Sequence, residues 1–73
     1  MATVEVPATM AGSICEVLVA VGESVSSGQE ILILESMKME IPVESPAAGT
    51  VSEILVKTGQ RIDEGQVLVR ITD

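Results

Sequence analysis

Apolar and polar residues alternate in short runs along this chain, and no apolar run has the length or the 3.6-residue period of an amphipathic helix. Valine and isoleucine supply 18 of the 23 Val, Ile and Leu residues. Their branched side chains are stiff and fit a pleated sheet better than a helix. The pattern therefore predicts an all-β domain, with longer strands over residues 2–6, 13–21, 29–35, 41–44, 50–57 and 66–72.

The sequence repeats itself at a spacing of 37 residues. This shift superposes all six glycines, as the pairs Gly12/Gly49, Gly22/Gly59 and Gly28/Gly65. An internal duplication follows, and two copies favour a closed assembly with pseudo-two-fold symmetry over an open solenoid. No linker or low-complexity segment interrupts the repeat, so we expect one domain over residues 1–73.

Each half contains a segment of the form Gly-x-x-(Val/Ile)-x-x-Gly, at 22–28 and 59–65. A segment of seven residues, bounded by glycine at both ends, is too short for a helix. We expect the central Val25 and Ile62 to fill the core between two turns that use positive φ at glycine. Counted as minimal strands, these segments bring the total to about eight, enough for two facing sheets or a flattened barrel.

Lys38 is the only basic residue among the first 56 positions, and it lies where the two repeats join. In a two-fold arrangement this join lies opposite the two chain ends, so we expect a tight hairpin there. The segment has no Asn-Gly or similar dipeptide, although tight hairpin turns require positive φ. Met37 and Lys38 at such a turn are conformationally costly, which indicates a functional reason for their presence.

Composition excludes several classes of function. The net charge of −7 opposes binding to a phosphate backbone, and the absence of Phe, Tyr and Trp leaves nothing to stack on a base, so we expect no nucleic-acid partner. There is no histidine, which excludes Cys/His nucleophiles and mixed Cys/His zinc sites. The carboxylates are scattered rather than paired. We expect no catalytic residue, no metal site and no enzyme activity in this chain alone.

The single Cys15 permits no internal disulfide, which is typical of a reducing compartment. The longest apolar run, at 17–21, is too short to cross a bilayer, and residues 1–7 have no features of a signal peptide. We therefore expect a cytoplasmic protein with no membrane partner. Cys15 matches Ser52 in the repeat, which favours a small, half-buried structural residue.

The run Glu35-Ser36-Met37-Lys38-Met39-Glu40, followed by Ser45-Pro46-Ala47-Ala48-Gly49 and combined with the two Gly-bounded segments, resembles the biotinyl attachment domain of biotin-dependent carboxylases. This family is a sister of the lipoyl domains of 2-oxo acid dehydrogenase complexes. The similarity runs from about Val4 to Ile71. It implies a flattened barrel of two four-stranded antiparallel sheets with Lys38 on an exposed hairpin. Two positions depart from the usual pattern, since many members have Ala at position 36 and Pro at position 11.

The resemblance also implies the chemistry of the site. Lys38 is expected to receive biotin through an amide formed by a biotin protein ligase, and Met37 and Met39 are expected to help that ligase recognise the site. The tethered biotin then carries an activated carboxyl group between a biotin carboxylase and a carboxyltransferase. We expect such a carrier to act as a monomer.

Two alternatives stay open at this point. A lipoyl carrier would hold lipoate on the same lysine, although that lysine usually follows Asp and precedes Ala, so the methionines around Lys38 favour biotin. An unmodified β interaction module would keep its function after Lys38→Ala. For single residues, Met37 and Met39 could instead fill the core. Glu35 and Glu40 could either tune ligase docking or form solvated strand ends.

Overall fold

A computed structural model describes residues 2–73 of the chain and contains only strands, turns and loops over that range. No helix in this part of the chain is therefore available to cross a membrane. The eight strands are β1 (Thr3–Pro7), β2 (Gly12–Val17), β3 (Ser24–Val25), β4 (Glu30–Ser36), β5 (Met39–Glu44), β6 (Gly49–Ile54), β7 (Arg61–Ile62) and β8 (Val67–Thr72).

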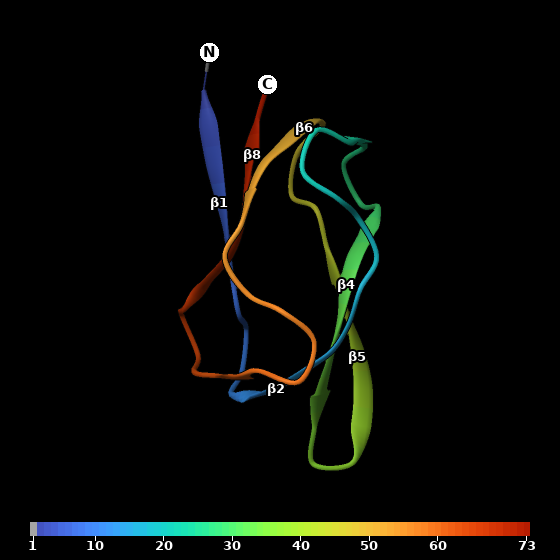
Figure 1. Cartoon of the computed structure of the whole chain (residues 1–73), viewed down its shortest axis with the longest axis vertical. Coiled ribbons are helices and arrows are strands. Elements are labelled where there is room, and N and C mark those ends of the chain that lie inside the picture. Colours follow the sequence, from blue (N-terminus) through green and yellow to red (C-terminus); the bar gives the residue numbers. More distant parts are fainter. Residues whose placement is uncertain (1) are drawn as a thin grey trace.

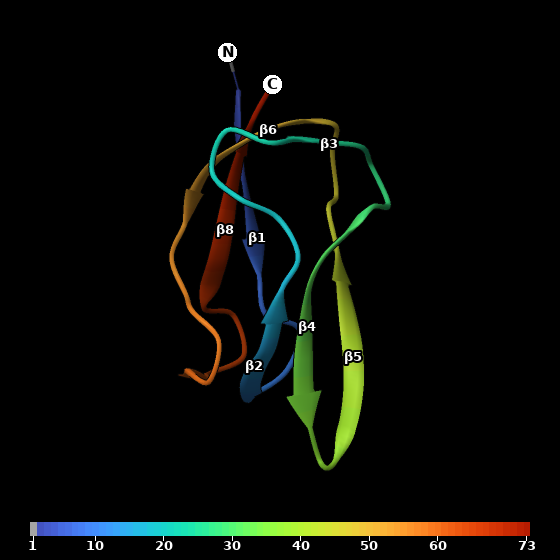
Figure 2. The same ribbon diagram turned by 45° about the vertical axis from the view of Figure 1, so that its right-hand side comes forward.

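The strands form two four-stranded sheets, in the orders β1-β8-β6-β3 and β5-β4-β2-β7, with every pairing antiparallel. The sheets face each other across an elongated body of 36 × 18 × 17 Å (Figures 1 and 2). Inward-facing aliphatic side chains of both sheets fill the space between them. The most completely buried are Ile14, Ile31, Leu32, Leu34, Val51, Leu68, Val69 and Ile71. The predicted all-β fold, a flattened barrel of two four-stranded antiparallel sheets, is confirmed.

The two repeats are interlocked rather than side by side. Each sheet takes two strands from each half of the chain, because β1 and β3 pair with β8 and β6, while β5 and β7 pair with β4 and β2. Hydrogen bonds outside the strand ladders repeat with the 37-residue shift. The amide of Ala8 donates to the carbonyl of Gln66 at 2.9 Å, and the equivalent Ser45 donates to Gln29 at 2.8 Å. The predicted pseudo-two-fold symmetry is confirmed.

The Gly-bounded segments are minimal strands, as predicted. β3 and β7 each contain two residues, and Val25 and Ile62 are only 5% and 3% exposed. All four glycines that bound these segments have φ between 85° and 93°. An L side chain rarely adopts that backbone conformation, so the turns require glycine.

Two strands end earlier than the pattern predicted. β2 stops at Val17 and β6 at Ile54, although the predicted strands continued to positions 21 and 57. A side chain of the following turn explains the difference, because Glu23 Oε1 accepts a hydrogen bond from the amide of Ala20 at 3.1 Å. That hydrogen bond engages an amide that would otherwise donate to a carbonyl group of a neighbouring strand. In the second half, Gln60 Oε1 accepts from the amide of Lys57 at 3.2 Å in the same way.

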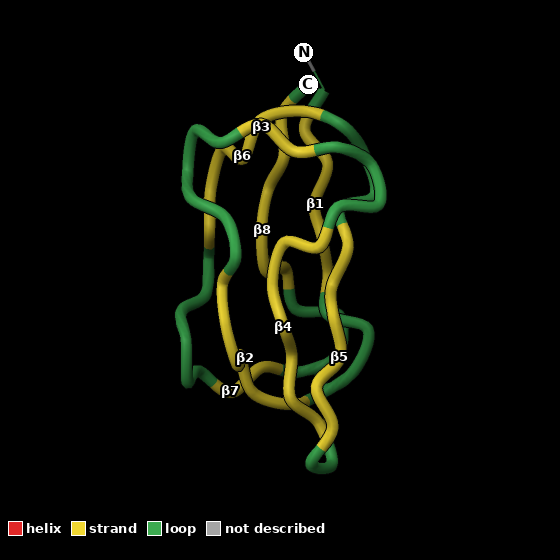
Figure 3. The backbone as a smooth tube through the Cα atoms, turned by 90° about the vertical axis from the view of Figure 1, so that its right-hand side faces the viewer, coloured by secondary structure: helices red, strands yellow, loops and turns green. Residues whose placement is uncertain are grey.

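The chain ends and the β4–β5 hairpin lie at opposite ends of the long axis (Figures 1 and 3). The ends are tied together, since the amide of Ala2 donates to Asp73 Oδ1 at 2.7 Å and the amide of Asp73 donates to the carbonyl of Ala2 at 3.1 Å. The join between the repeats thus occupies the position that symmetry predicted for it.

Candidate functional site at the β4–β5 hairpin

The β4–β5 hairpin turns through two residues, Met37 and Lys38. The ladder closes at the pair Ser36/Met39, so only these two residues connect the strands. Their φ angles are 53° and 65°, and within residues 2–73 they are the only non-glycine residues with positive φ. Positive φ at both central residues defines the type I′ turn, whose twist matches that of the flanking strands. Each L residue held there costs about 1–2 kcal/mol, so the hairpin is strained as the sequence indicated.

The side chains of the turn point into water. Met37 is 92% exposed and Met39 is 64% exposed, so the interpretation of these methionines as core fillers is wrong. Lys38 is exposed between them, and it forms no ion pair with any of residues 2–73. The hairpin therefore presents one primary amine flanked by two exposed thioethers.

Ser36 anchors the base of the hairpin to a neighbouring loop. Its Oγ donates a hydrogen bond to the carbonyl oxygen of Ala11 at 3.0 Å. These are the two positions at which the sequence departs from the usual family pattern, and the structure places them in direct contact. Next to them, a Cβ on Gly12 would collide with the carbonyl oxygen of Glu35. The β2–β4 approach below the turn therefore requires glycine at position 12.

Carboxylates flank the hairpin. Glu35 and Glu40 are cross-strand partners on β4 and β5, and both are exposed. Like charges directly opposite each other are unfavourable in a sheet, so this pair does not serve stability. Glu40 Oε2 lies 3.7 Å from Sγ of Cys15, which is half-buried as predicted. Burial raises the pKa of the Cys15 thiol, and the charge of Glu40 and its hydrogen bond raise it further.

The chemistry open to this hairpin is that of its exposed amine. Within residues 2–73 no three carboxylate or thiol groups gather as a metal site would require. Lysine amines in water are protonated at neutral pH, so an enzyme that acylates one must remove the proton itself. An exposed amine on a protruding turn fits covalent attachment of a carboxylic acid such as biotin, because the attaching enzyme can enclose it from several sides.

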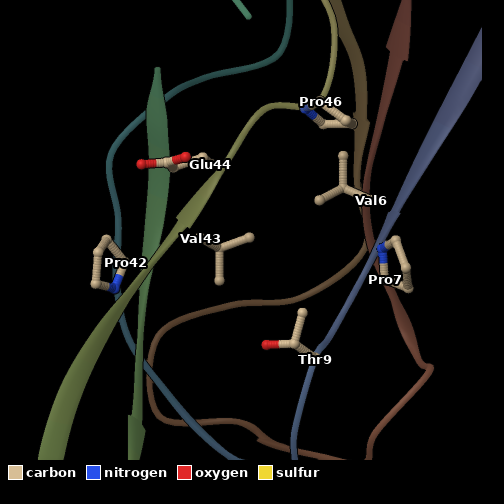
Figure 4. A pocket seen from close by; sticks show the side chains of 7 residues that line it. All are labelled: Val6, Pro7, Thr9, Pro42, Val43, Glu44 and Pro46. Atoms are coloured by element: carbon tan, nitrogen blue, oxygen red, sulfur yellow. The ribbon is translucent and has the colours of Figure 1, made fainter. Parts of the chain in front are cut away.

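A separate hollow lies between the edge strands β1 and β5, away from the hairpin (Figure 4). All three prolines of the chain, Pro7, Pro42 and Pro46, line it together with Val6 and Val43. Proline has no N–H group to offer to an added strand, and edge strands commonly carry it for that reason. We interpret the prolines around this hollow as residues that protect two open sheet edges from pairing with another strand.

Sequence reasoning missed two residues near the hairpin, Ser13 and Arg61. Both line a hollow that also includes Met37 and Lys38. A signal for Arg61 was available, because its counterpart in the first repeat is Ser24 and the positive charge is present in one half only.

Comparison with known proteins gives a family match over nearly the whole chain and matches to single relatives over about half of it. The sequence model of the family described as "Biotin-requiring enzyme" matches residues 2–71. The biotin/lipoyl attachment protein of Bacillus subtilis is 56% identical over 34 residues, which cover 47% of each chain. The methylmalonyl-CoA carboxyltransferase 1.3S subunit of Propionibacterium freudenreichii is 50% identical over 36 residues, covering 49% of this chain and 29% of that subunit.

Among solved structures, the urea carboxylase of Kluyveromyces lactis contains a similar unit, with a TM-score of 0.92 and 28% identity over 99% of this chain and 6% of the carboxylase. The chain thus spans less than half the length of each of these relatives. Because the family match extends over nearly all of its length, the chain belongs to the biotin/lipoyl attachment family of biotin-requiring enzymes.

Proposed function

We propose that this chain is a biotin carrier domain and that Lys38 is the residue to which biotin is attached. The observation that carries the proposal is the exposed amine on the strained Met37-Lys38 turn, at the end of the domain farthest from both termini. A more stable turn would use Asn-Gly. The chain instead keeps a costly lysine between two exposed methionines, and attachment of a cofactor to that lysine would explain the cost.

The residues of the hairpin have separate roles in this proposal. Met37 and Met39 form the apolar surface that a biotin protein ligase recognises, and their exposure of 92% and 64% leaves them free to be bound. Ser36 holds the base of the hairpin in place through Ala11. The domain contributes position, and the ligase contributes the base that frees the amine for acylation.

The attached cofactor supplies the chemistry of carrying a carboxyl group, and the domain itself is not an enzyme. We propose that its partners are a biotin carboxylase and a carboxyltransferase, since one relative is named as a carboxyltransferase subunit and another as a urea carboxylase. Tethering raises the local concentration of the cofactor at both partners above that of a free molecule. Residues 1–73 act as one monomeric domain in this proposal. The free thiol of Cys15 agrees with a place in the cytoplasm.

Intact-mass measurement tests the attachment site. The wild-type chain and the variants Lys38→Arg and Lys57→Arg are incubated with a biotin protein ligase, ATP and biotin, and avidin blots are run in parallel. Lys57 is the only other lysine and is also exposed, so it is a matched control. We expect one increment of biotin minus water on the wild type and on Lys57→Arg, and none on Lys38→Arg.

Protein purified from its own cell distinguishes the other outcomes. An avidin-negative increment of lipoate on Lys38 would assign the chain to the lipoyl carriers. An unmodified lysine in both experiments would contradict the carrier function and leave an interaction module.

A further inference from the structure

A hollow of about 300 Å³ lies beside the acceptor lysine, between the hairpin and the short strand β7. Met37 and Lys38 form part of its lining, and Ser13, Glu35 and Arg61 supply polar groups to it. Its size is at the lower limit of pockets that bind small molecules. A group tethered to Lys38 therefore begins its path at the wall of this hollow.

The polar groups of the hollow form one row across the sheet. Ser13 on β2 is the cross-strand partner of Arg61 on β7 and also of Glu35 on β4. Neighbouring strands are about 4.8 Å apart, which places the backbones of Arg61 and Glu35 about 10 Å apart with Ser13 between them. Within residues 2–73 neither charged side chain is engaged in a hydrogen bond or an ion pair. The row thus offers a guanidinium donor, a hydroxyl group and a carboxylate acceptor.

The opposite end of the domain carries the same backbone without these charges. The residues that symmetry relates to Arg61, Ser13 and Glu35 are Ser24, Thr50 and Thr72. Ser24 and Thr50 are also cross-strand partners, and so are Thr50 and Thr72, so the two rows are built alike. Since the fold forms with neutral residues at one end, the charges at the lysine end are not required by the architecture.

We propose that this row is a docking site for the ureido ring of the biotin carried by Lys38, an inference that rests on the proposed function. A ureido group has one oxygen acceptor between two N–H donors. Arg61 donates to the oxygen, and Glu35 accepts from an N–H, with Ser13 between them able to do either. Because the ring is tethered at the wall of the hollow, weak contacts are enough to populate the docked position. The site holds the cofactor against its own domain between visits to the partner enzymes.

The test compares Arg61→Ser with Lys57→Ser after biotin attachment. Arg61→Ser copies the residue found in the other repeat. Lys57→Ser removes an equal charge at an exposed position that does not line the hollow. Amide NMR spectra of the attached and unattached forms are recorded for each protein, and the rate of capture by avidin is measured by stopped flow.

In the wild type, attachment is expected to shift the amide signals of Ser13, Glu35 and Arg61 as well as those of the turn. Arg61→Ser abolishes these remote shifts and speeds avidin capture about threefold, because the ring is no longer docked. Lys57→Ser changes neither result. Shifts confined to residues 37–39, or equal capture rates for the two variants, would overturn the proposal.

The docking site can be tested independently of whether a ligase attaches biotin to Lys38. On a Cys15→Ser, Lys38→Cys variant, biotin can be attached through a thioether, and the same spectra are recorded. Absence of enzymatic biotin attachment by mass would count against the proposed function. Absence of remote shifts in the chemically biotinylated protein would count against the docking site.

Discussion

The strain in the Met37-Lys38 turn predicts that the hairpin can be made more stable at the expense of its function. We consider the double variant Met37→Asn, Lys38→Gly, which installs the dipeptide favoured by type I′ turns. Relief of two unfavourable φ angles is worth about 2–4 kcal/mol, from about 1–2 kcal/mol each. The extra freedom of glycine in the unfolded chain removes about 0.5–1 kcal/mol of this gain. Both side chains are exposed, so little packing is lost.

The expected net gain in the free energy of unfolding is therefore at least about 1 kcal/mol, which raises Tm by about 4–8 °C in a domain of this size. Far-UV circular dichroism is the suitable probe, because the chain has no Trp, Tyr or Phe for fluorescence. We expect that a biotin protein ligase no longer modifies this variant, since the amine proposed as the acceptor is gone.

Lys57→Gly is the matched control for the turn variant. Lys57 is also an exposed lysine in a turn region, but its φ is not positive. Glycine there brings only the entropic cost, and we expect unchanged or lower stability. A double turn variant that is no more stable than the wild type would refute the interpretation of the turn as strained.

Two further predictions concern the surroundings of the hairpin. Gly12→Ala and its symmetry mate Gly49→Ala should each reduce the free energy of unfolding by about 1–3 kcal/mol in urea titrations, because an added Cβ meets a backbone carbonyl in both. Only Gly12→Ala should also slow biotin attachment. Equal attachment rates for the two variants would contradict the coupling of Gly12 to the hairpin. Because burial and Glu40 raise the pKa of Cys15, its alkylation by iodoacetamide, followed by mass spectrometry, should require higher pH than that of a free thiol. Glu40→Gln should shift the dependence of the alkylation rate on pH to lower pH. Identical pH dependence in the two proteins would contradict the role of Glu40.

The fold was predictable because its main constraints are local and repeated. Glycines that recur at one spacing mark the turns, and φ near 90° at four of them shows why no other residue serves there. Alternating Val and Ile positions mark the buried faces. Strand ends were less predictable, because the bond from Ala20 to Glu23 depends on a side chain that also suits a solvated loop.

The setting of Lys38, the proposed acceptor, was only partly predictable. The repeat located the Met37-Lys38 turn, and its exposure and strain agree with that placement. The contact between Ser36 and Ala11 joins residues 25 positions apart and depends on the packing of a loop against the hairpin. Arg61 reaches the same region only because β7 pairs with β2, a strand of the first half of the chain, and no local pattern reveals that pairing.

The exchange of strands between the halves has a consequence for how such a chain could arise. A peptide with one repeat contains only two of the four strands of each sheet, so it cannot form a complete sheet by itself. It must find a second copy before either layer exists, at a rate set by concentration. Covalent fusion of the two copies makes that encounter intramolecular. The segment that joins the copies then becomes the hairpin turn that contains Lys38.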